Sequence, residues 1–265
     1  MMTDPRTTPD PNIVSKRTPA RVSVPISDLN RHAGHKRDRQ VLLGERVTIL
    51  GSVDGHSYVV TEKDNYVGFI NSSHLCADHP TTHRISALAS HTYGEAYMKS
   101  ADRISLSHGS LVRVTEETEK FAKTEYGYIP KQHLCKVEDR DTAYVETAKL
   151  FLGTPYLWGG NSNTGIDCSG LVQAALTASG IPCPGDSDQQ EKQLGKTVSS
   201  NSRMESGDLI FWKGHIALAV DADTLIHANA FHMACVYEPL HAAVKRIKDQ
   251  GDGDITAHKR LFSVN

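Results

Sequence analysis

An internal repeat restricts the fold of this chain more than any other feature of its sequence. Residues 66–76 and 125–135 match in Gly, aromatic, Ile, His, Leu and Cys at a constant offset. A second block upstream also matches, but the first copy is longer there by about six residues around Asp54-Gly55, which predicts a hairpin insertion. The matching positions of this block are Gly44 with 47–49 and Gly109 with 112–114. The repeat therefore predicts two copies of one small folding unit.

Each copy consists of short apolar runs separated by turn residues. The runs are 47–50, 57–60 and 66–70 in the first copy, and 112–115, 121–124 and 127–129 in the second. Short strands at this spacing predict a small β-barrel for each copy. The run of Gly, aromatic and Ile that begins at Gly68 and at Gly127 resembles the last strand of bacterial SH3-like domains. We expect a mobile or draped arm over residues 1–20, then SH3-like barrels over 21–80 and 81–138.

Residues 139–265 follow a different pattern. Apolar residues at helical spacing predict a helix over 142–152, with Asp141 as its N-cap, and another over 168–178, capped by Asp167. Apolar runs joined by turn residues predict three antiparallel strands, over 208–212, 215–220 and 224–229. The sequence thus predicts an α+β domain behind two small β-barrels.

Cys168 is a candidate nucleophile because it opens the second of these helices. Unpaired backbone N–H groups and the positive end of the helix dipole favour a thiolate there, which predicts a lowered pKa. A free Cys is more often a small buried hydrophobe. Gly170 and Gly159-Gly160 weigh against that alternative, since they leave out side chains where a substrate backbone would approach.

His215 and His227 supply a base and a group that orients it. In a hairpin whose turn is centred on Ala222, the two histidines share one face of the sheet and lie opposite or one step diagonal. One imidazole can then hydrogen-bond the other, as a thiolate nucleophile and its base require. The pattern leaves open which face packs on the helix of Cys168, with Ala217 and Ala219 as the better candidates.

Five motifs of this region resemble the NlpC/P60 family of papain-like cysteine peptidases. They are PYLWGG at 155–160, GIDCSGLV at 165–172, GDLIF at 207–211, HIAL at 215–218 and LIHA at 225–228. The resemblance implies a papain-like α+β catalytic domain. It also implies that Cys168 is the nucleophile, His215 the general base and His227 the third polar residue of the site.

The two SH3-like modules extend the resemblance to γ-D-glutamyl-L-diamino acid endopeptidases of the dipeptidyl-peptidase VI type, which act in murein recycling. This subgroup cleaves free L-Ala-γ-D-Glu-L-diamino acid peptides, and the resemblance implies that Tyr156, Asp167 and Ser169 hold the free α-amino group. Asp167 could equally be a plain helix cap. The subgroup also brings an aromatic residue from the first SH3-like domain to the site, for which Tyr58 and Tyr66 are candidates.

Composition narrows the partners and the compartment. The chain has 29 Lys and Arg against 31 Asp and Glu, a formal charge of −2, so neither nucleic acid nor a membrane is an expected partner. Five scattered cysteines suit a reducing compartment better than a disulfide framework. Residues 1–20 lack the apolar segment of a signal peptide, so we expect the chain in the cytoplasm.

Histidines and cysteines also raise the possibility of zinc. Cys76, His79 and His83 have zinc-like spacing, and a second cluster consists of His227, His232 and Cys235. Cys76 recurs as Cys135 in the repeat, where no His follows three positions on, which favours a structural role. We therefore expect no metal and no cofactor.

Two other functions stay open at this point. The protein could be a wall hydrolase or amidase of the same fold, or a non-catalytic protein that binds murein peptides. The complete set of Cys168, His215 and His227 favours an enzyme. The sequence leaves open whether the diamino acid is meso-diaminopimelate or L-lysine, and it does not fix the oligomeric state. Residues 186–190 are expected in the cleft or in a solvated loop, and Trp158 and Trp212 in the core.

Overall fold

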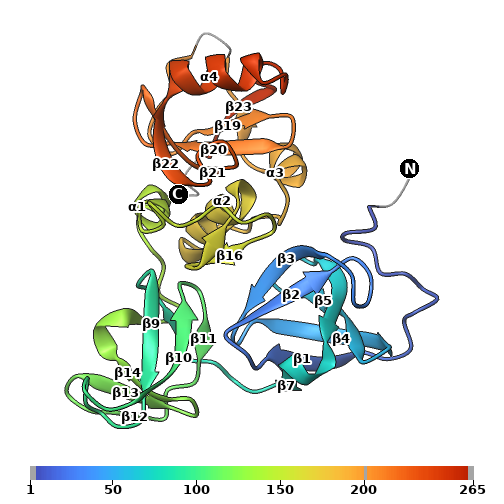
Figure 1. The fold of residues 1–265 in the computed structure, drawn as a ribbon, viewed down its shortest axis with the longest axis vertical. Coiled ribbons are helices and arrows are strands. Elements are labelled where there is room, and N and C mark those ends of the chain that lie inside the picture. The colour runs from blue at the N-terminus through green and yellow to red at the C-terminus, as the bar shows by residue number, and fades with distance from the viewer. Residues whose placement is uncertain (1–3, 200–201, 262–265) are drawn as a thin grey trace. The chain divides into compact units, whose positions relative to one another are not determined.

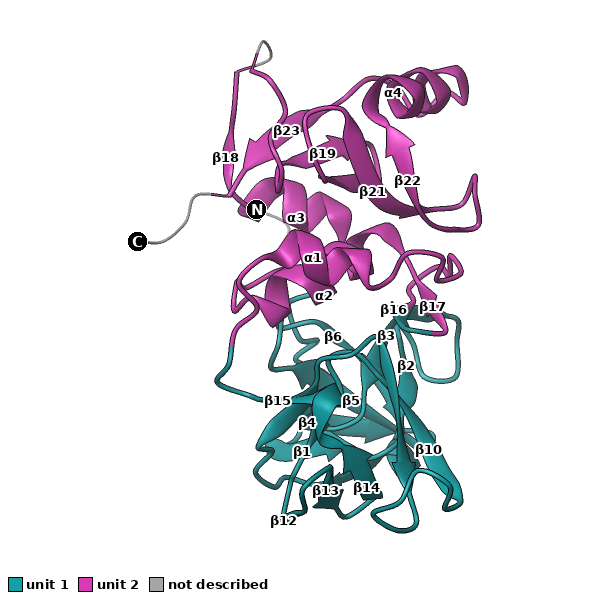
Figure 2. Ribbon diagram, turned by 90° about the vertical axis from the view of Figure 1, so that its left-hand side faces the viewer, with its two compact units in different colours: residues 1–139, 161–163 teal, residues 140–160, 164–265 magenta. Residues whose placement is uncertain are grey.

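The computed structural model describes residues 4–199 and 202–261. The chain divides into two compact units, residues 1–139 with 161–163 and residues 140–160 with 164–265 (Figure 2). None of the helices in these described residues is both long and apolar enough to cross a membrane.

The first copy of the repeat folds into an antiparallel seven-stranded sheet with the order β3-β2-β6-β5-β4-β1-β7 (Figure 1). Asp54 and Gly55 join β4 to β5 with φ of +46° and +76°, so the predicted insertion forms the tip of a long hairpin. Val22, Leu29 and Ile70 are fully buried in its core. The elements are β1 (Thr18–Val22), β2 (Ile26–Asn30), β3 (Arg37–Leu42), β4 (Arg46–Val53), β5 (His56–Thr61), β6 (Val67–Asn71), η1 (Ser72–His74) and β7 (Leu75–Ala77).

The second copy forms two smaller sheets, with the orders β10-β9-β14-β13-β12 and β11-β8-β15. Its core contains Ile85, Leu106 and Ile129, and also Leu43 from the first copy. The backbone N–H of Leu111 donates to the Leu43 carbonyl at 2.8 Å. The elements are β8 (His83–Ile85), β9 (Ala89–Tyr93), β10 (Asp102–Ser107), β11 (Leu111–Val112), β12 (Glu116–Glu117), β13 (Phe121–Thr124), β14 (Gly127–Pro130), η2 (Lys131–His133) and β15 (Leu134–Lys136).

Equivalent contacts recur in the two copies. The Ser27 hydroxyl lies 2.8 Å from His74 Nδ1, and the Ser90 hydroxyl lies 2.9 Å from His133 Nδ1. Each histidine precedes a short strand whose Cys faces an Arg across the sheet; the pairs are Cys76 with Arg21 and Cys135 with Arg84. The predicted repeat is therefore a structural repeat, and its cysteines lie in strand pairs.

The N-terminal arm is draped along the first copy. The backbone N–H of Val67 donates to the Arg6 carbonyl at 2.7 Å, and that of Ser15 donates to the Leu50 carbonyl at 2.8 Å. β1 begins at Thr18. The limits predicted for the two barrels at residues 80 and 138 stay predictions.

The second unit is the predicted α+β domain, a sheet of order β18-β23-β19-β20-β21-β22. Both ribbon views place α4 on one side of this sheet and α1, α2 and α3 on the other (Figures 1 and 2). The helices are α1 (Tyr144–Lys149), α2 (Cys168–Ala178), α3 (Ser187–Gln193) and α4 (Leu240–Asp249). The strands are β18 (Lys196–Thr197), β19 (Leu209–Trp212), β20 (His215–Ala219), β21 (Thr224–Asn229), β22 (Ala234–Pro239) and β23 (Ala257–Arg260), and β16 (Asn161–Ser162) and β17 (Gly165–Ile166) precede α2 in the chain.

The predicted helix over 168–178 is confirmed residue for residue, but the cap of the first helix is wrong. α1 begins at Tyr144, and its N-cap Ala143 makes no side-chain hydrogen bond. The Asp141 carboxylate instead accepts from the Thr147 hydroxyl at 2.7 Å. The expectation that Ala217 and Ala219 pack on the helix of Cys168 is wrong, because both belong to a core shared with α4.

Candidate active site

The start of α2 is held by Asp167, the predicted cap. Asp167 Oδ1 accepts from the backbone N–H of Gly170 at 2.7 Å and from the Ser169 hydroxyl at 3.0 Å. Its other oxygen, Oδ2, accepts from the backbone N–H of Gly159 at 2.9 Å. These bonds hold the start of the helix, where Cys168 is the first residue, against the loop that carries Gly159.

Burial affects the pKa of the Cys168 thiol more strongly than its position at the helix start does. Burial raises the pKa of its thiol to about 12, and the neighbouring Asp167 carboxylate also raises it. The backbone N–H groups of Ile216, Ser169 and Cys168 itself act in the opposite direction. The expectation of a lowered pKa is therefore wrong for this site, and Cys168 is a neutral thiol near pH 7.

The two histidines meet as strand geometry predicts. Leu218 pairs with Ile226 and Ala219 with Leu225, the register expected for a turn centred on Ala222. His215 Nε2 lies 2.9 Å from His227 Nδ1, and the ring centroids are 5.1 Å apart. Because the backbone N–H of Ile216 faces the sulfur of Cys168, the thiol lies beside the first residues of β20.

Both imidazoles are neutral in this environment. Burial, and then the electrostatic effects of His227 and Arg246, lower the pKa of His215 to about 3. Burial also lowers the pKa of His227, although the neighbouring Glu238 carboxylate partly opposes it. The resting site thus holds a thiol and a neutral base, so a thiolate would form only as its proton moves to the base.

The sequence prediction missed two residues next to this pair. His227 Nε2 lies 2.9 Å from Glu238 Oε2, and Arg246 of α4 donates to both oxygens of Glu238, at 2.9 and 2.8 Å. The register of β21 with β22 pairs His227 with Val236, so Glu238 is its diagonal neighbour on the same face. The position of Glu238 follows only from this strand register, and Arg246 arrives from a separate helix.

Three further predicted residues gather next to Cys168. Burial raises the pKa of the Tyr156 hydroxyl, and electrostatic interactions with Cys168 and Asp167 raise it further, which places all three groups within electrostatic reach. Ser169 is tied to Asp167 by its hydroxyl. Gln190, a residue without a predicted role, also holds the first turn of α2, since its Nε2 donates to the Ser169 carbonyl at 3.0 Å.

The predictions for the two tryptophans and for residues 186–190 are only partly met. Trp158 is 71% exposed rather than part of the core, while Trp212 is buried as expected. Trp158 belongs to the loop that leads to Asp167, where the chain turns through Gly159 with φ of +67°. Residues 186–190 open the helix α3, in which Gln189 and Gln190 are buried.

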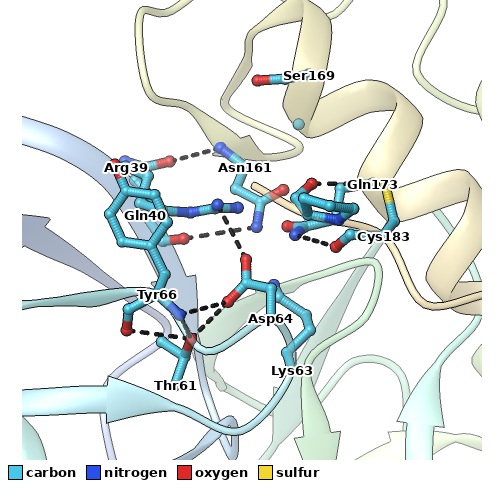
Figure 3. A network of polar contacts seen from close by, with 12 residues as sticks. Arg39, Gln40, Thr61, Lys63, Asp64, Tyr66, Asn161, Ser169, Gln173 and Cys183 are labelled. Carbon is cyan, nitrogen blue, oxygen red and sulfur yellow. Dashed lines mark hydrogen bonds and ion pairs between the residues drawn. The ribbon is translucent and has the colours of Figure 1, made fainter. Parts of the chain in front are cut away.

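The two candidate aromatics of the first copy are buried within the first unit. Tyr58 packs against Phe69 with centroids 4.8 Å apart, and its hydroxyl accepts from the backbone N–H of Asp10 at 2.8 Å. The Tyr66 ring lies 5.0 Å from the guanidinium carbon of Arg39 (Figure 3). A role of either ring in substrate binding stays a prediction.

Two residues with zinc-like spacing, Cys76 and His79, have other contacts. His79 Nε2 lies 3.3 Å from Glu125 Oε1, and Cys76 takes part in the β1–β7 pairing. Over residues 4–199 and 202–261, no group of three or more His, Cys, Asp and Glu side chains is arranged to hold a metal ion.

Comparisons with known protein families agree with this geometry. Residues 153–245 match the NlpC/P60 family, and residues 31–75 match the bacterial dipeptidyl-peptidase Sh3 domain. The chain therefore carries an NlpC/P60 cysteine-peptidase domain behind an N-terminal bacterial SH3 domain, and the predicted fold class is confirmed.

Individual relatives extend this assignment. The chain is 28% identical to dipeptidyl-peptidase 6 of Lysinibacillus sphaericus over 72% of this chain and 79% of the relative. It is 39% identical to the gamma-D-glutamyl-L-lysine dipeptidyl-peptidase of Bacillus subtilis, but over only 32% of this chain and 30% of that relative. A crystal structure of an NlpC/P60 family protein from Bacillus cereus superposes with a TM-score of 0.77 at 18% identity, covering 92% of this chain and 99% of that one, which is a likeness of fold.

Proposed function

We propose that the protein is a cysteine endopeptidase that hydrolyses the γ-D-glutamyl-L-diamino acid bond of free murein peptides and serves in their recycling. The observation that carries the proposal is the cluster of Tyr156, Asp167 and Ser169 around the start of the helix that carries Cys168, where Ser169 is hydrogen-bonded to Asp167 and Tyr156 interacts electrostatically with both Asp167 and Cys168. A carboxylate and two hydroxyls can accept the three N–H bonds of a free α-ammonium group. The names of the relatives from Lysinibacillus sphaericus and Bacillus subtilis support the same bond.

In this proposal Cys168 is the nucleophile and His215 the general base. The thiol proton moves to His215 as the sulfur attacks the γ-carbonyl carbon of D-Glu and a C–S bond forms. His215 then returns the proton to the departing nitrogen of the diamino acid, and the C–N bond breaks. Water hydrolyses the thioester with His215 again as base, which releases L-Ala-D-Glu and restores the thiol.

The start of α2 supplies the remaining parts of the reaction. The backbone N–H of Cys168 lies at the helix N-terminus, where it can donate to the oxyanion of the tetrahedral intermediate. Asp167 places the substrate because its carboxylate charge attracts the ammonium group one residue from the sulfur. Asp167 already accepts three hydrogen bonds, so it offers the ammonium a pre-oriented carboxylate.

The test is mass spectrometry of products from three substrates. These are L-Ala-γ-D-Glu-meso-diaminopimelate, its N-acetylated analogue and intact murein sacculi, with the Cys168→Ala protein as control. Cleavage of the free tripeptide alone supports a recycling endopeptidase. Equal cleavage of sacculi or of the blocked peptide contradicts it and indicates a wall hydrolase, and cleavage of none contradicts it and indicates an amidase or a binding protein.

A further inference from the structure

A continuous line of polar side chains leads away from His215 into the domain. His215 Nε2 lies 2.9 Å from His227 Nδ1, and His227 Nε2 lies 2.9 Å from Glu238 Oε2. Arg246 closes the line with two hydrogen bonds to the Glu238 carboxylate. His227 is fully buried and Glu238 is 6% exposed, so water does not compete for these bonds.

The ionised Glu238 carboxylate, at the end of this chain of hydrogen bonds, determines which ring nitrogens carry protons. An ionised carboxylate only accepts hydrogen bonds, so His227 must carry its proton on Nε2. A neutral imidazole has one N–H, so His227 Nδ1 accepts, and His215 must donate from Nε2. The lone pair of His215 is thereby left on Nδ1, the only ring nitrogen that remains free to take a proton from Cys168.

We propose that Glu238, clamped by Arg246, is a positioning residue that selects the tautomers of both histidines and so keeps His215 Nδ1 ready to accept the thiol proton. This inference rests on the proposed function, in which His215 is the base. It assigns to the buried Glu238–Arg246 pair a part in catalysis, although neither residue touches the reacting atoms.

The surrounding charges agree with this role. Hydrogen bonds from Arg246 and His227 hold the pKa of Glu238 near 2, so the carboxylate stays ionised and does not take the proton from the histidines. The groups that act on His227 are His215, Glu238, Arg246 and, more weakly, His232. Arg246 is itself held in place, because it donates to Gln250 at 2.9 Å and lies against the Phe231 ring.

The first test reads the tautomers directly and needs no substrate. Nitrogen NMR of the full chain with labelled histidine distinguishes protonated from bare ring nitrogens, and His215→Gln and His227→Gln variants assign the signals. We expect protons on Nε2 of both rings near pH 7. A proton on Nδ1 of either ring would overturn the proposal, whether or not the protein cleaves murein peptides.

The second test uses Glu238→Gln with Asp208→Asn as the matched control. Asp208 is equally a buried carboxylate held by an Arg and a His, Arg260 and His258, but it does not contact the histidine pair. In Glu238→Gln, Arg246 would hold the amide oxygen, and the amide N–H would force the proton of His227 to Nδ1. His215 would then carry its proton on Nδ1, the wrong nitrogen for the base.

We expect Glu238→Gln to lower kcat about 10²-fold or more with little change in KM, because a wrong tautomer blocks proton transfer. The rate at which iodoacetamide alkylates Cys168 should fall in parallel, read on the Cys168 peptide by mass spectrometry. Asp208→Asn should leave both within about threefold, as expected for a change remote from the site. Equal losses in the two variants, with unchanged nitrogen signals, would reduce Glu238 to a structural role.

Discussion

Two clusters of the C-terminal domain have the same chemistry and different surroundings. Glu238 is bound by Arg246 and His227 at 2.8 to 2.9 Å, and Asp208 is bound by Arg260 and His258 at 2.6 to 2.8 Å. Both carboxylates have a lowered pKa because of these partners. The first cluster continues through His227 to His215, whereas the second joins β23 to the loop before β19. The two clusters therefore differ in what lies beyond the histidine: His227 contacts His215, which connects the Glu238 cluster to the candidate active site.

The largest difference should appear when one histidine of each region is removed. His215→Ala should lower kcat/KM for the free tripeptide by about 10³-fold or more, since the base is lost. His258→Ala, which truncates the partner of Asp208, should stay within about threefold. Product formation is measured by mass spectrometry. Comparable losses of kcat/KM in the two variants would contradict the proposed difference between the clusters.

Asp167 is a third carboxylate of the domain, and its proposed role is to bind the substrate amine rather than to position the histidines. Asp167→Asn keeps a good helix cap but removes the charge that faces the substrate amine. The preference for the free over the N-acetylated tripeptide should fall by about 10 to 100-fold, the weight of a hydrogen bond to a charged group. The ratio of the two kcat/KM values measures it, and an unchanged ratio would leave Asp167 as a cap alone.

Loss of the carboxylate charge in either cluster should lower the free energy of unfolding by a similar amount. Glu238→Gln and Asp208→Asn each remove a buried charge from its Arg, which should lower the free energy of unfolding by about 1–3 kcal/mol. Urea denaturation at pH 7 compares them. If Glu238→Gln alone were destabilising, its loss of activity would have a structural explanation.

Acid should destabilise the protein through the histidine pair. The pKa of His215 is about 3 in the folded protein against about 6.5 in the unfolded chain, so the unfolded state binds more protons between these values. Unfolding free energy should therefore fall as pH decreases from 6.5, by up to about 1.4 kcal/mol per pH unit for this group. His215→Gln should flatten the slope between pH 6.5 and 5, where Glu238 is still ionised. An identical slope in both proteins would refute the lowered pKa.

Local patterns predicted most of the fold and part of the site. α2 and its Asp167 cap follow from helical spacing over a few residues, and the histidine contact follows from strand parity around Ala222. The repeat predicted both β copies because its matching positions are turn and core residues.

The remaining features depend on contacts distant in the chain or on burial. Arg246 reaches Glu238 from α4, and no local period shows that approach. The pKa of Cys168 was predicted in the wrong direction because the helix start is visible in sequence and the degree of burial is not. Trp158 is expected in the core but is exposed, because its loop turns it outward.

Leu43 makes the two copies of the repeat a single cooperative unit. This side chain belongs to the first copy and fills the core of the second. A fragment that begins after residue 80 would carry a cavity of leucine size, a defect that costs about 3–5 kcal/mol in well-packed cores. Truncation or unfolding of the first copy is therefore expected to weaken the second copy as well.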